Sequence, residues 1–504
     1  MLGSTMPART IEMQGALLQR ITDRLPIIYV AIALFVSILL CALTPPFFIP
    51  DEIAHSLRAI EIGHGELMAH RSSGEVGSKI DDNAVQVMLG TFAIEERMER
   101  QYPIAHQRPD GRISDAQLAP FRGIRWAGHS VFADFLNTAV YPPVLYIPQA
   151  IGWRLGEAID LTILHTLFLA RLLAAISAIA IGWLAMRLCV SGRWLLFAYL
   201  LLPTKLSLNA SCSQDALLLA IAGLIMALLS RPLSFKRLFT ASELISVSAL
   251  MAICIIARPP YLPLVLVLLL PAFAIRRVRR QQILPAALAV VIAVGLFGGW
   301  EVLVHQLGNT IGPDAQPVQQ MSFLRAHPVE GVRNLLGGTA REIPQLVVRG
   351  METLGGNDVF APIPIYALLF FSLLGLGLLS PIDGLKTWRS RGLLLFALVA
   401  TIAGLSFAEY IIWNSPGSHR VNGLQSRYYL PLVPLAFFLF SRHGRRQNKG
   451  TPDGQVEISW RKRQEMLLLT SGSAFIVAVL YTPWIAAHSF YKLGLAHALY
   501  LAIH

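Results

Sequence analysis

The sequence predicts an all-α polytopic membrane protein. Of its 504 residues, 54% are hydrophobic and only 14% are charged, and the mean hydropathy of +0.55 is too high for one or two soluble domains. Several apolar runs reach the roughly 20 residues that a helix needs to cross about 30 Å of hydrocarbon. Because these runs are continuous and do not alternate, they predict helices rather than transmembrane strands.

The apolar runs and their flanks predict about eleven transmembrane helices. The first run, 27–44, follows a polar segment, 1–26. It ends in CALTPPFF instead of the small residues of a cleavage site, so it predicts an uncleaved anchor. The other ten runs are 163–188, 193–208, 213–230, 240–257, 261–275, 283–304, 361–380, 392–413, 427–441 and 465–487.

The segment AVYPPVLYIPQAIGW, at 139–153, can form a further span or a helix at the membrane surface, and the loop charges favour the second. If it does not cross, every strongly basic short loop falls on the side of the N-terminus, as the excess of Lys and Arg in cytoplasmic loops requires. These loops contain Arg187, Arg193 and the stretches 231–237, 276–280, 386–391 and 442–464. One domain, 27–504, then has a cytoplasmic N-terminal segment and two large outer loops, 45–162 and 305–360. We expect amphipathic pieces of the first loop, such as AHSLRAIEIGHGEL, to lie against the membrane.

Two further features argue against other kinds of site and partner. The four cysteines, Cys41, Cys189, Cys212 and Cys254, lie singly in or beside apolar runs, without the CxxC spacing of metal or redox sites. The net charge of +12 follows from basic cytoplasmic loops. It therefore does not predict a nucleic-acid partner.

Charged residues near the outer ends of the spans predict a polar site, because charges are costly within a membrane. In this topology six of them fall on the outer side: Arg171, Lys205, Asp215, Arg258, Glu409 and Arg427. Each alone can be a residue that snorkels to the interface or caps a helix. Together with Asp51 and Glu52 of the first outer loop, they predict one shallow pocket at the outer face.

The stretch TPPFFIPDEIAH, at 44–55, brings carboxylates to the outer surface directly after the first span. Its prolines cannot continue a helix, so they turn the chain. Asp51 then either caps a helix that begins at Glu52 or stands as a functional carboxylate just above the lipid head groups. His55 lies one turn from Asp51, a spacing that can chelate a metal ion, but solvated loop histidines are common. We predict no metal site.

Three separated blocks resemble an uncharacterised bacterial family of multi-pass membrane proteins. They read PPFFIPDEIAHSLRAIEIGHGEL in the first outer loop, METLGGNDVFAPIPIYAL at the end of the second, and VNGLQSRYYLPLVPL late in the chain. The usual first-loop pattern of that family is Pro-Pro-x-x-x-Pro-Asp-Glu-Pro-x-His, and here Ile53 stands in place of its last Pro. In the second block, Gly356-Asn357-Asp358 replaces the common Gly-Trp-Leu-Asp.

That family is similar in turn to the GT-C superfamily of membrane glycosyltransferases. Those proteins have an acidic motif in the first outer loop, a Pro-Pro helix after it, and a second acidic residue at the start of a later span. The matching positions here are Asp51 with Glu52, the stretch 141–150, and Asp215. The resemblance implies a GT-C-like bundle that transfers a hexosyl or pentosyl group from a polyprenyl-phosphate carrier to a glycan, lipid or protein acceptor. The reaction would take place at the outer face of the bacterial cytoplasmic membrane and invert the anomeric centre. No cofactor is implied, although some GT-C proteins bind a divalent cation.

The resemblance also implies roles for individual residues. A carboxylate, Asp51 or Glu52, acts as general base or orients the acceptor hydroxyl, and cations stabilise the departing lipid phosphate. Arg427 and then Arg258 are favoured, because Arg grips phosphate with two N–H groups. The implied substrate-binding residues are His55, Arg171, Lys205, Asp215, Arg258, Asp358, Gln425, Arg427 and Tyr428. The alternatives are a transporter or flippase of an envelope lipid or saccharide, and a scaffold without chemistry; transporters typically bind substrate near the bilayer midplane, within repeated halves.

Overall fold

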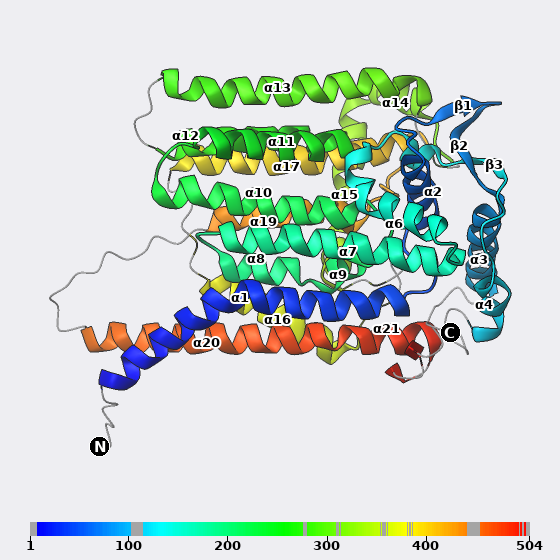
Figure 1. Cartoon of the computed structure of the whole chain (residues 1–504). Coiled ribbons are helices and arrows are strands. Elements are labelled where there is room, and N and C mark those ends of the chain that lie inside the picture. Colours follow the sequence, from blue (N-terminus) through cyan, green and yellow to red (C-terminus); the bar gives the residue numbers. More distant parts are fainter. Residues whose placement is uncertain are drawn as a thin grey trace.

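The protein is mostly helical. Figure 1 shows long helices lying side by side, with short helices and a small sheet gathered at one end. The computed structural model describes residues 8–101, 114–275, 280–308, 312, 314–352, 354, 359, 361–380, 382, 385, 387–440, 454–492, 494–495 and 498–499.

The elements fall into three groups. The longer helices are α1 (Ala8–Leu43), α7 (Ile163–Leu188), α10 (Asp215–Phe235), α11 (Ala241–Ala257), α13 (Arg280–Val304), α15 (Pro328–Glu352), α16 (Ile363–Leu379), α17 (Trp388–Ile412) and α20 (Gly454–Leu480). Shorter segments continue or connect them: α8 (Arg193–Leu200), α9 (Pro203–Asn209), η3 (Pro259–Leu269), α12 (Leu270–Ala274), η4 (His305–Leu307), α14 (Pro317–Ala326), α18 (Ser426–Tyr429), η5 (Leu430–Leu432), α19 (Val433–Ala436), η6 (Phe437–Phe440) and α21 (Thr482–Tyr491). The chain between α1 and α7 forms α2 (Glu52–Gly63), β1 (His70–Ser72), β2 (Glu75–Asp81), α3 (Asp82–Gln101), α4 (Asp115–Arg122), β3 (Ser130–Asp134), α5 (Leu136–Ala139), η2 (Pro143–Tyr146) and α6 (Ile147–Ala158).

Six of the predicted runs form helices that are long and apolar enough to cross a membrane, within the part of the chain that the structure describes. They are Leu17–Leu43, Ile163–Leu188, Asp215–Phe235, Ile283–Leu307, Trp388–Ile412 and Arg463–Tyr491. Four other runs form the shorter apolar segments Ala241–Ala257, Pro259–Ala274, Ile363–Leu379 and Ser426–Phe440. The run at 193–208 is broken into α8 and α9, because Pro203 has no N–H with which to continue a helix. The class of helical membrane protein is therefore confirmed, and the total of eleven spans stays a prediction.

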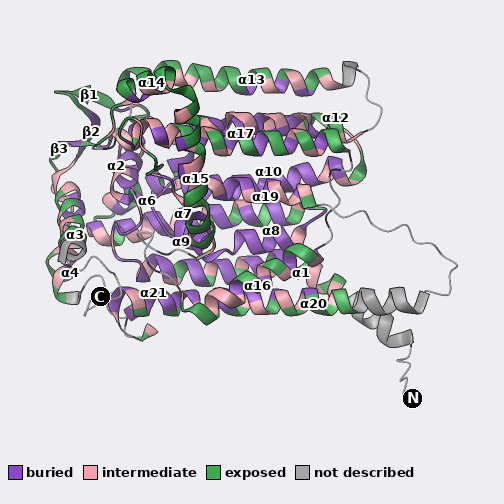
Figure 2. Ribbon diagram, turned by 180° about the vertical axis from the view of Figure 1, so that it is seen from behind, coloured by how far each residue is buried: buried purple, intermediate pink, exposed green. Residues whose placement is uncertain are grey.

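The central helix is α10. Of its apolar window 94% is buried, against 17% for the span Ile283–Leu307 that contains most of α13. Figure 2 shows this contrast, with α10 almost wholly buried and α13 largely exposed. Because Asp215 is the first residue of α10, a carboxylate stands at one end of the most enclosed helix in the bundle.

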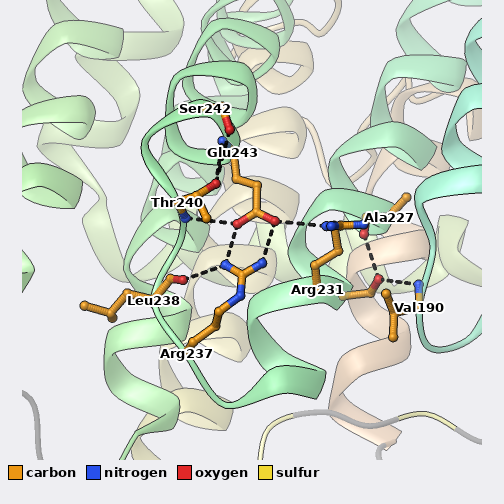
Figure 3. Close-up of polar contacts among 9 residues, drawn as sticks. Val190, Ala227, Arg231, Arg237, Leu238, Thr240, Ser242 and Glu243 are labelled. Carbon is orange, nitrogen blue, oxygen red and sulfur yellow. Dashed lines mark hydrogen bonds and ion pairs between the residues drawn. The ribbon is translucent and has the colours of Figure 1, made fainter.

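The turn between α10 and α11 lies at the opposite end of the bundle from α2 and the sheet (Figure 1). There Glu243 accepts hydrogen bonds from Arg231 at 2.9 Å and from Arg237 at 2.6 and 2.7 Å, as Figure 3 shows. The side chain of Thr240 caps α11 and forms a reciprocal capping box with Glu243. The basic stretch 231–237 thus lies at the end away from the first loop, as the predicted topology requires.

The first loop contains a three-stranded antiparallel sheet, in the order β1-β2-β3, that the sequence did not lead us to predict. In β2, three consecutive residues, 76–78, are buried instead of alternating with exposed ones. The period-2 pattern from which a strand is recognised is therefore absent. The sheet makes this loop a packed cap on one end of the bundle.

The helix α2 is buried over most of its length, which contradicts, for this part, the expectation that AHSLRAIEIGHGEL lies against the membrane; the last residues of that segment, 64–67, are exposed. Residues 55–61 are all buried, because α2 packs against α6, α5 and β2. Its polar positions are filled by interactions within the protein: Arg58 pairs with Glu61 and donates to the carbonyl oxygens of Leu67 and Tyr141. The polar face that suggested water is thus satisfied internally.

The helix α6 does not cross the bundle, in agreement with the prediction for 139–153. It has 12 residues and is about 18 Å long at 1.5 Å per residue, against about 30 Å of hydrocarbon. It packs closely along α7, where a Cβ at Gly152 would lie 2.5 Å from the Cα of Ala170. This contact fixes the cap to the bundle.

Candidate functional site

A cavity of about 860 Å³ opens beside the N-terminus of α2. Its wall is formed by the start of α2, the residues of and after α5, the junction of α11 and η3, the ends of α13 and α17, and the residues around α18. It brings together six predicted site residues from three distant parts of the chain: Asp51, His55, Arg258, Gln425, Arg427 and Tyr428. The predicted convergence of polar residues therefore holds for these six.

The backbone before α2 presents Asp51 to the cavity. Prolines at 45, 46 and 50 prevent the first helix from continuing, and Asp51 adopts a left-handed conformation with φ 62°. Asp tolerates this region better than most residues, at a cost of roughly 1–2 kcal/mol. Asp51 occupies the N-cap position of α2, but its side chain makes no capping hydrogen bond. Asp51 thus stands at the N-cap position, as predicted, without making the side-chain hydrogen bond of a helix cap.

A chain of ion pairs links Asp51 to the interior. Its Oδ2 lies 2.5 Å from Nη2 of Arg427, whose Nη1 lies 3.3 Å from Oδ2 of Asp215. The other oxygen of Asp215 accepts from Nη2 of Arg258 at 2.8 Å. Asp215 does not line the cavity itself, and holds the two arginines in its wall. The ring of Tyr428 lies 3.9 Å below the guanidinium carbon of Arg258, a cation–π contact that fixes its plane.

Each of the two arginines has one donor that no described residue accepts from. The residues Arg258 and Arg427 are 8% and 5% exposed, and the Nε of each has no hydrogen-bond partner among the described residues. Buried guanidinium N–H groups are costly when they are unpaired. Both residues also line the cavity, and an oxyanion there would be a suitable partner for their guanidinium groups.

Local sequence explains where these arginines stand. Arg258 ends α11, because Pro259 and Pro260 follow it and cannot continue an α-helix. Arg427 lies in α18, the four-residue helix that follows a turn at Gly423 with φ 90°. Both side chains therefore project from helix ends rather than from the middle of a span.

The charge and burial of the site set the protonation of Asp51 and His55. Burial favours the neutral carboxyl form, but the charge and hydrogen bond of Arg427 outweigh it and hold the pKa of Asp51 below its ordinary value. Burial lowers the pKa of His55 to about 4. The Nδ1 of His55 lies 2.6 Å from the hydroxyl of Tyr146, and its ring stacks on Tyr141. At neutral pH the site thus holds an ionised Asp51 beside a neutral, anchored imidazole.

Glu52 and Arg171 lie outside the cavity wall, in a buried ion pair. Nε and Nη2 of Arg171 lie 2.8 and 2.5 Å from the two oxygens of Glu52. Arg171 also donates to the carbonyl oxygens of Cys41, Thr44 and Pro45, and Glu52 accepts from the backbone N–H of Cys212. With these groups engaged, the pair fastens the turn before α2 to α7 and to the loop before α10. The pair thus fixes the backbone next to Asp51.

Another predicted residue, Lys205, is not part of the cavity wall. Lys205 is buried in α9, where its Nζ donates to Oδ1 of Asn209 at 3.0 Å, and it does not line the cavity. Asp358 lies outside the described residues. Nor does the described part of the chain contain a group of three His, Cys, Asp or Glu that could hold a metal ion.

The cavity also contains residues for which the sequence predicted no role in binding or catalysis. Glu409 and Trp413, at and after the end of α17, line it together with Glu301 and His305 at the end of α13. The charge of Glu409 within the apolar run SFAEYIIW predicts a place among the outer charges, but it predicts no particular role. Glu301 and the aromatic residues gave no signal, because tryptophan and isolated charges are common at span ends.

A second, apolar groove of about 710 Å³ lies against the other face of α18. Ser426, Tyr429 and Leu430 line this groove, whereas Gln425, Arg427 and Tyr428 line the polar cavity. The rest of its wall comes from α8, α15, α16, α17, α19 and η6. One short helical segment therefore separates a cationic cavity from an apolar groove.

The chain was also compared with models of known protein families. A family model described as "Predicted membrane protein (DUF2142)" matches residues 34–436. The chain belongs to the DUF2142 family. The match includes every residue that lines the polar cavity, and it confirms membership of a multi-pass membrane family without stating an activity. No curated protein matches the chain, and the likeness to GT-C enzymes stays a prediction.

Proposed function

We propose that this DUF2142 protein is an integral membrane glycosyltransferase of the GT-C type. It transfers a hexosyl or pentosyl group from a polyprenyl-phosphate carrier to a glycan, lipid or protein acceptor, with inversion at the anomeric carbon. The site faces outward from the bacterial cytoplasmic membrane. The observation that carries the proposal is the pair of arginines, Arg258 and Arg427, that line one polar cavity and share the carboxylate of Asp215.

A lipid-linked sugar phosphate has one part that suits the polar cavity and another that suits the apolar groove, the two spaces on either side of α18. The phosphate needs cationic donors placed in advance, and two arginines that share Asp215 supply them with little cost of reorganisation. The isoprenoid chain needs an apolar groove, and the wall with Tyr429 and Leu430 offers one. A soluble nucleotide sugar would use the first feature but not the second.

The reaction divides between the carboxylates and the arginines. The oxygen of the acceptor hydroxyl forms a bond to the anomeric carbon as its proton passes to a carboxylate of the cavity. The bond between that carbon and the phosphate oxygen breaks, and its electron pair stays on the phosphate. Arg258 and Arg427 neutralise the charge that develops there, while Asp51 holds Arg427 in place.

Reconstituted vesicles test the proposal. Wild-type protein is supplied with a panel of radiolabelled polyprenyl-phosphate sugars and with an envelope fraction as acceptor, and labelled product is measured. We expect transfer by the wild type and by Glu75→Gln, a change at an exposed carboxylate of β2. In Asp51→Asn we expect a loss of up to about 10²–10³-fold, because Arg427 is no longer held for the leaving phosphate. If the wild type moves labelled lipid between leaflets and forms no glycosidic product with any donor, the protein is a transporter and the proposal is wrong.

A further inference from the structure

Glu409 is a carboxylate of the cavity that the ion-pair chain leaves unused. Asp51 and Asp215 each pair with Arg427, whereas the Oε2 of Glu409 is shielded from solvent and has no hydrogen-bond partner among the described residues. It lies near enough to Arg258, Arg427 and Asp51 for their charges to act on it. A carboxylate oxygen can accept a hydrogen bond, and Glu409 lines the cavity, so a hydroxyl group of a bound molecule is a suitable partner for it.

The surroundings of Glu409 hold it in a fixed place. Gly423 has φ 90°, and a Cβ there would lie 2.5 Å from Oε2 of Glu409 and 2.9 Å from the ring of Trp413. Asn414 keeps this loop against α17: its Nδ2 donates to the carbonyl oxygens of Glu409 and Asn422, and its Oδ1 accepts from the backbone N–H of Asn422. The glycine, the tryptophan and the carboxylate therefore form one rigid corner of the cavity.

That corner has the composition of a sugar-binding surface. Trp413 is 39% exposed and lines the cavity beside Glu409, so it offers an apolar face next to an acceptor of hydrogen bonds. The guanidinium groups lie on other elements of the same cavity, at the end of α11 and in α18. This arrangement separates a hydroxyl-binding corner from the phosphate-binding arginines.

We propose that Glu409 is the general base that removes the proton from the acceptor hydroxyl, in the glycosyl transfer proposed above, on which this inference rests. Asp51 is then a positioning residue, which keeps Arg427 ready for the leaving phosphate. As the acceptor oxygen bonds to the anomeric carbon, its proton moves to the Glu409 carboxylate. The electron pair of the broken bond leaves with the polyprenyl phosphate, and Glu409 later releases the proton to water.

The test compares variants at the two carboxylates in the same vesicles, with a donor that the wild type turns over. Glu409→Gln should lower kcat by about 10²–10⁴-fold while the Kd for the donor stays within about twofold, because the arginines are intact. Glu409→Asp should retain part of the activity. Glu409→Ala should recover donor turnover with azide, an anion that attacks without losing a proton, to give a glycosyl azide of inverted configuration. Asp51→Asn should not be rescued by azide, since its defect lies at the leaving group.

The outcomes separate the two proposals. If the wild type transfers sugar and Glu409→Gln does so at the same rate, Glu409 is not the base, although the proposed function stands. If azide restores turnover to Asp51→Asn and not to Glu409→Ala, Asp51 is the base instead. If the wild type itself forms no product, both proposals are overturned. Circular dichroism and retention on size-exclusion chromatography show whether each variant is folded.

Discussion

Asp51 and Glu52 are adjacent in the chain and each meets an arginine, but the two pairs have opposite surroundings. The side chain of Glu52 is fully buried, and those of Arg171 and Glu52 make two mutual contacts and four more to the backbone. The side chain of Asp51 is 41% exposed, and its partner Arg427 retains an unpaired N–H. A saturated pair fixes the backbone, whereas an unsaturated pair beside a cavity can bind something. Neighbouring residues of the sequence thus have very different surroundings: Glu52 is enclosed in the bundle, whereas Asp51 lines the cavity.

The largest expected effect distinguishes the pairs by stability. Glu52→Gln should lower the free energy of unfolding by about 3–5 kcal/mol, because it leaves Arg171 buried without its counter-charge. Asp51→Asn should change it by less than about 1 kcal/mol, because Asn tolerates the left-handed backbone and Arg427 keeps Asp215. Chemical unfolding in mild detergent measures both. Equal losses in the two variants would contradict the contrast drawn here.

The next effect is the pH dependence of stability that His55, a neighbour of Asp51 in the cavity, should produce. Because burial lowers the pKa of His55 from 6.5 to about 4, the unfolded chain binds a proton more readily than the folded one. Its contribution to stability, up to about 3 kcal/mol, is present above pH 6.5 and is lost as the pH falls toward 4. Replacement His55→Gln should therefore flatten the stability profile between these values. In the matched variant His70→Gln, which alters an exposed histidine of β1, the slope should persist.

A smaller effect tests whether the apolar groove next to Arg427 binds the lipid chain of the donor. Gly377 lines that groove, and a Cβ there would lie 4.0 Å from the nearest side-chain atom, Cδ2 of Leu195. Gly377→Leu should fit into the groove and raise KM for a long-chain polyprenyl donor by about 10-fold, the equivalent of losing one or two buried methylene groups. With a donor whose lipid is too short to enter the groove, KM should not change. An equal effect on both donors would count against the groove as the lipid site.

The smallest effect concerns Glu243 and its two arginine partners, at the other end of the bundle. Glu243→Gln removes the carboxylate shared by Arg231 and Arg237 but keeps a side chain that can still serve the capping box. The two arginine side chains are about one-third exposed. We expect a loss of about 1 kcal/mol or less in unfolding free energy and no change in transfer rate. A large loss of transfer would mean that this end of the bundle also contributes to the site.

The sequence predicted at which end of the bundle charged residues lie better than it predicted which residues they contact. Continuous apolar runs and basic loops predicted the helices and placed Asp51, Arg258 and Arg427 at one end, where the structure brings them together. The runs could not show that Glu52 would meet Arg171, 119 positions later, since spacing along a helix says nothing of such distant contacts.

Other features lay beyond the sequence because tertiary packing overrides local pattern. The polar face of α2 suggested exposure to water, but the buried pair of Arg58 and Glu61 satisfies it internally. Lys205 was expected to face substrate because it lies near a span end, and the break at Pro203 turns it instead toward Asn209. The importance of Glu409 became visible only when Gly423 was found against it.

The helix α18 has only four residues, and its neighbours in sequence point to different compartments: Arg427 and Tyr428 to the cavity, Ser426 and Tyr429 to the groove. Deleting a single residue just before Arg427 would move this arginine to the position of Ser426 and put a cation among the apolar side chains of the groove. Such a segment tolerates little change in its length. A single lipid-linked molecule bound in both spaces would contact this segment with its polar head in the cavity and with its apolar tail in the groove.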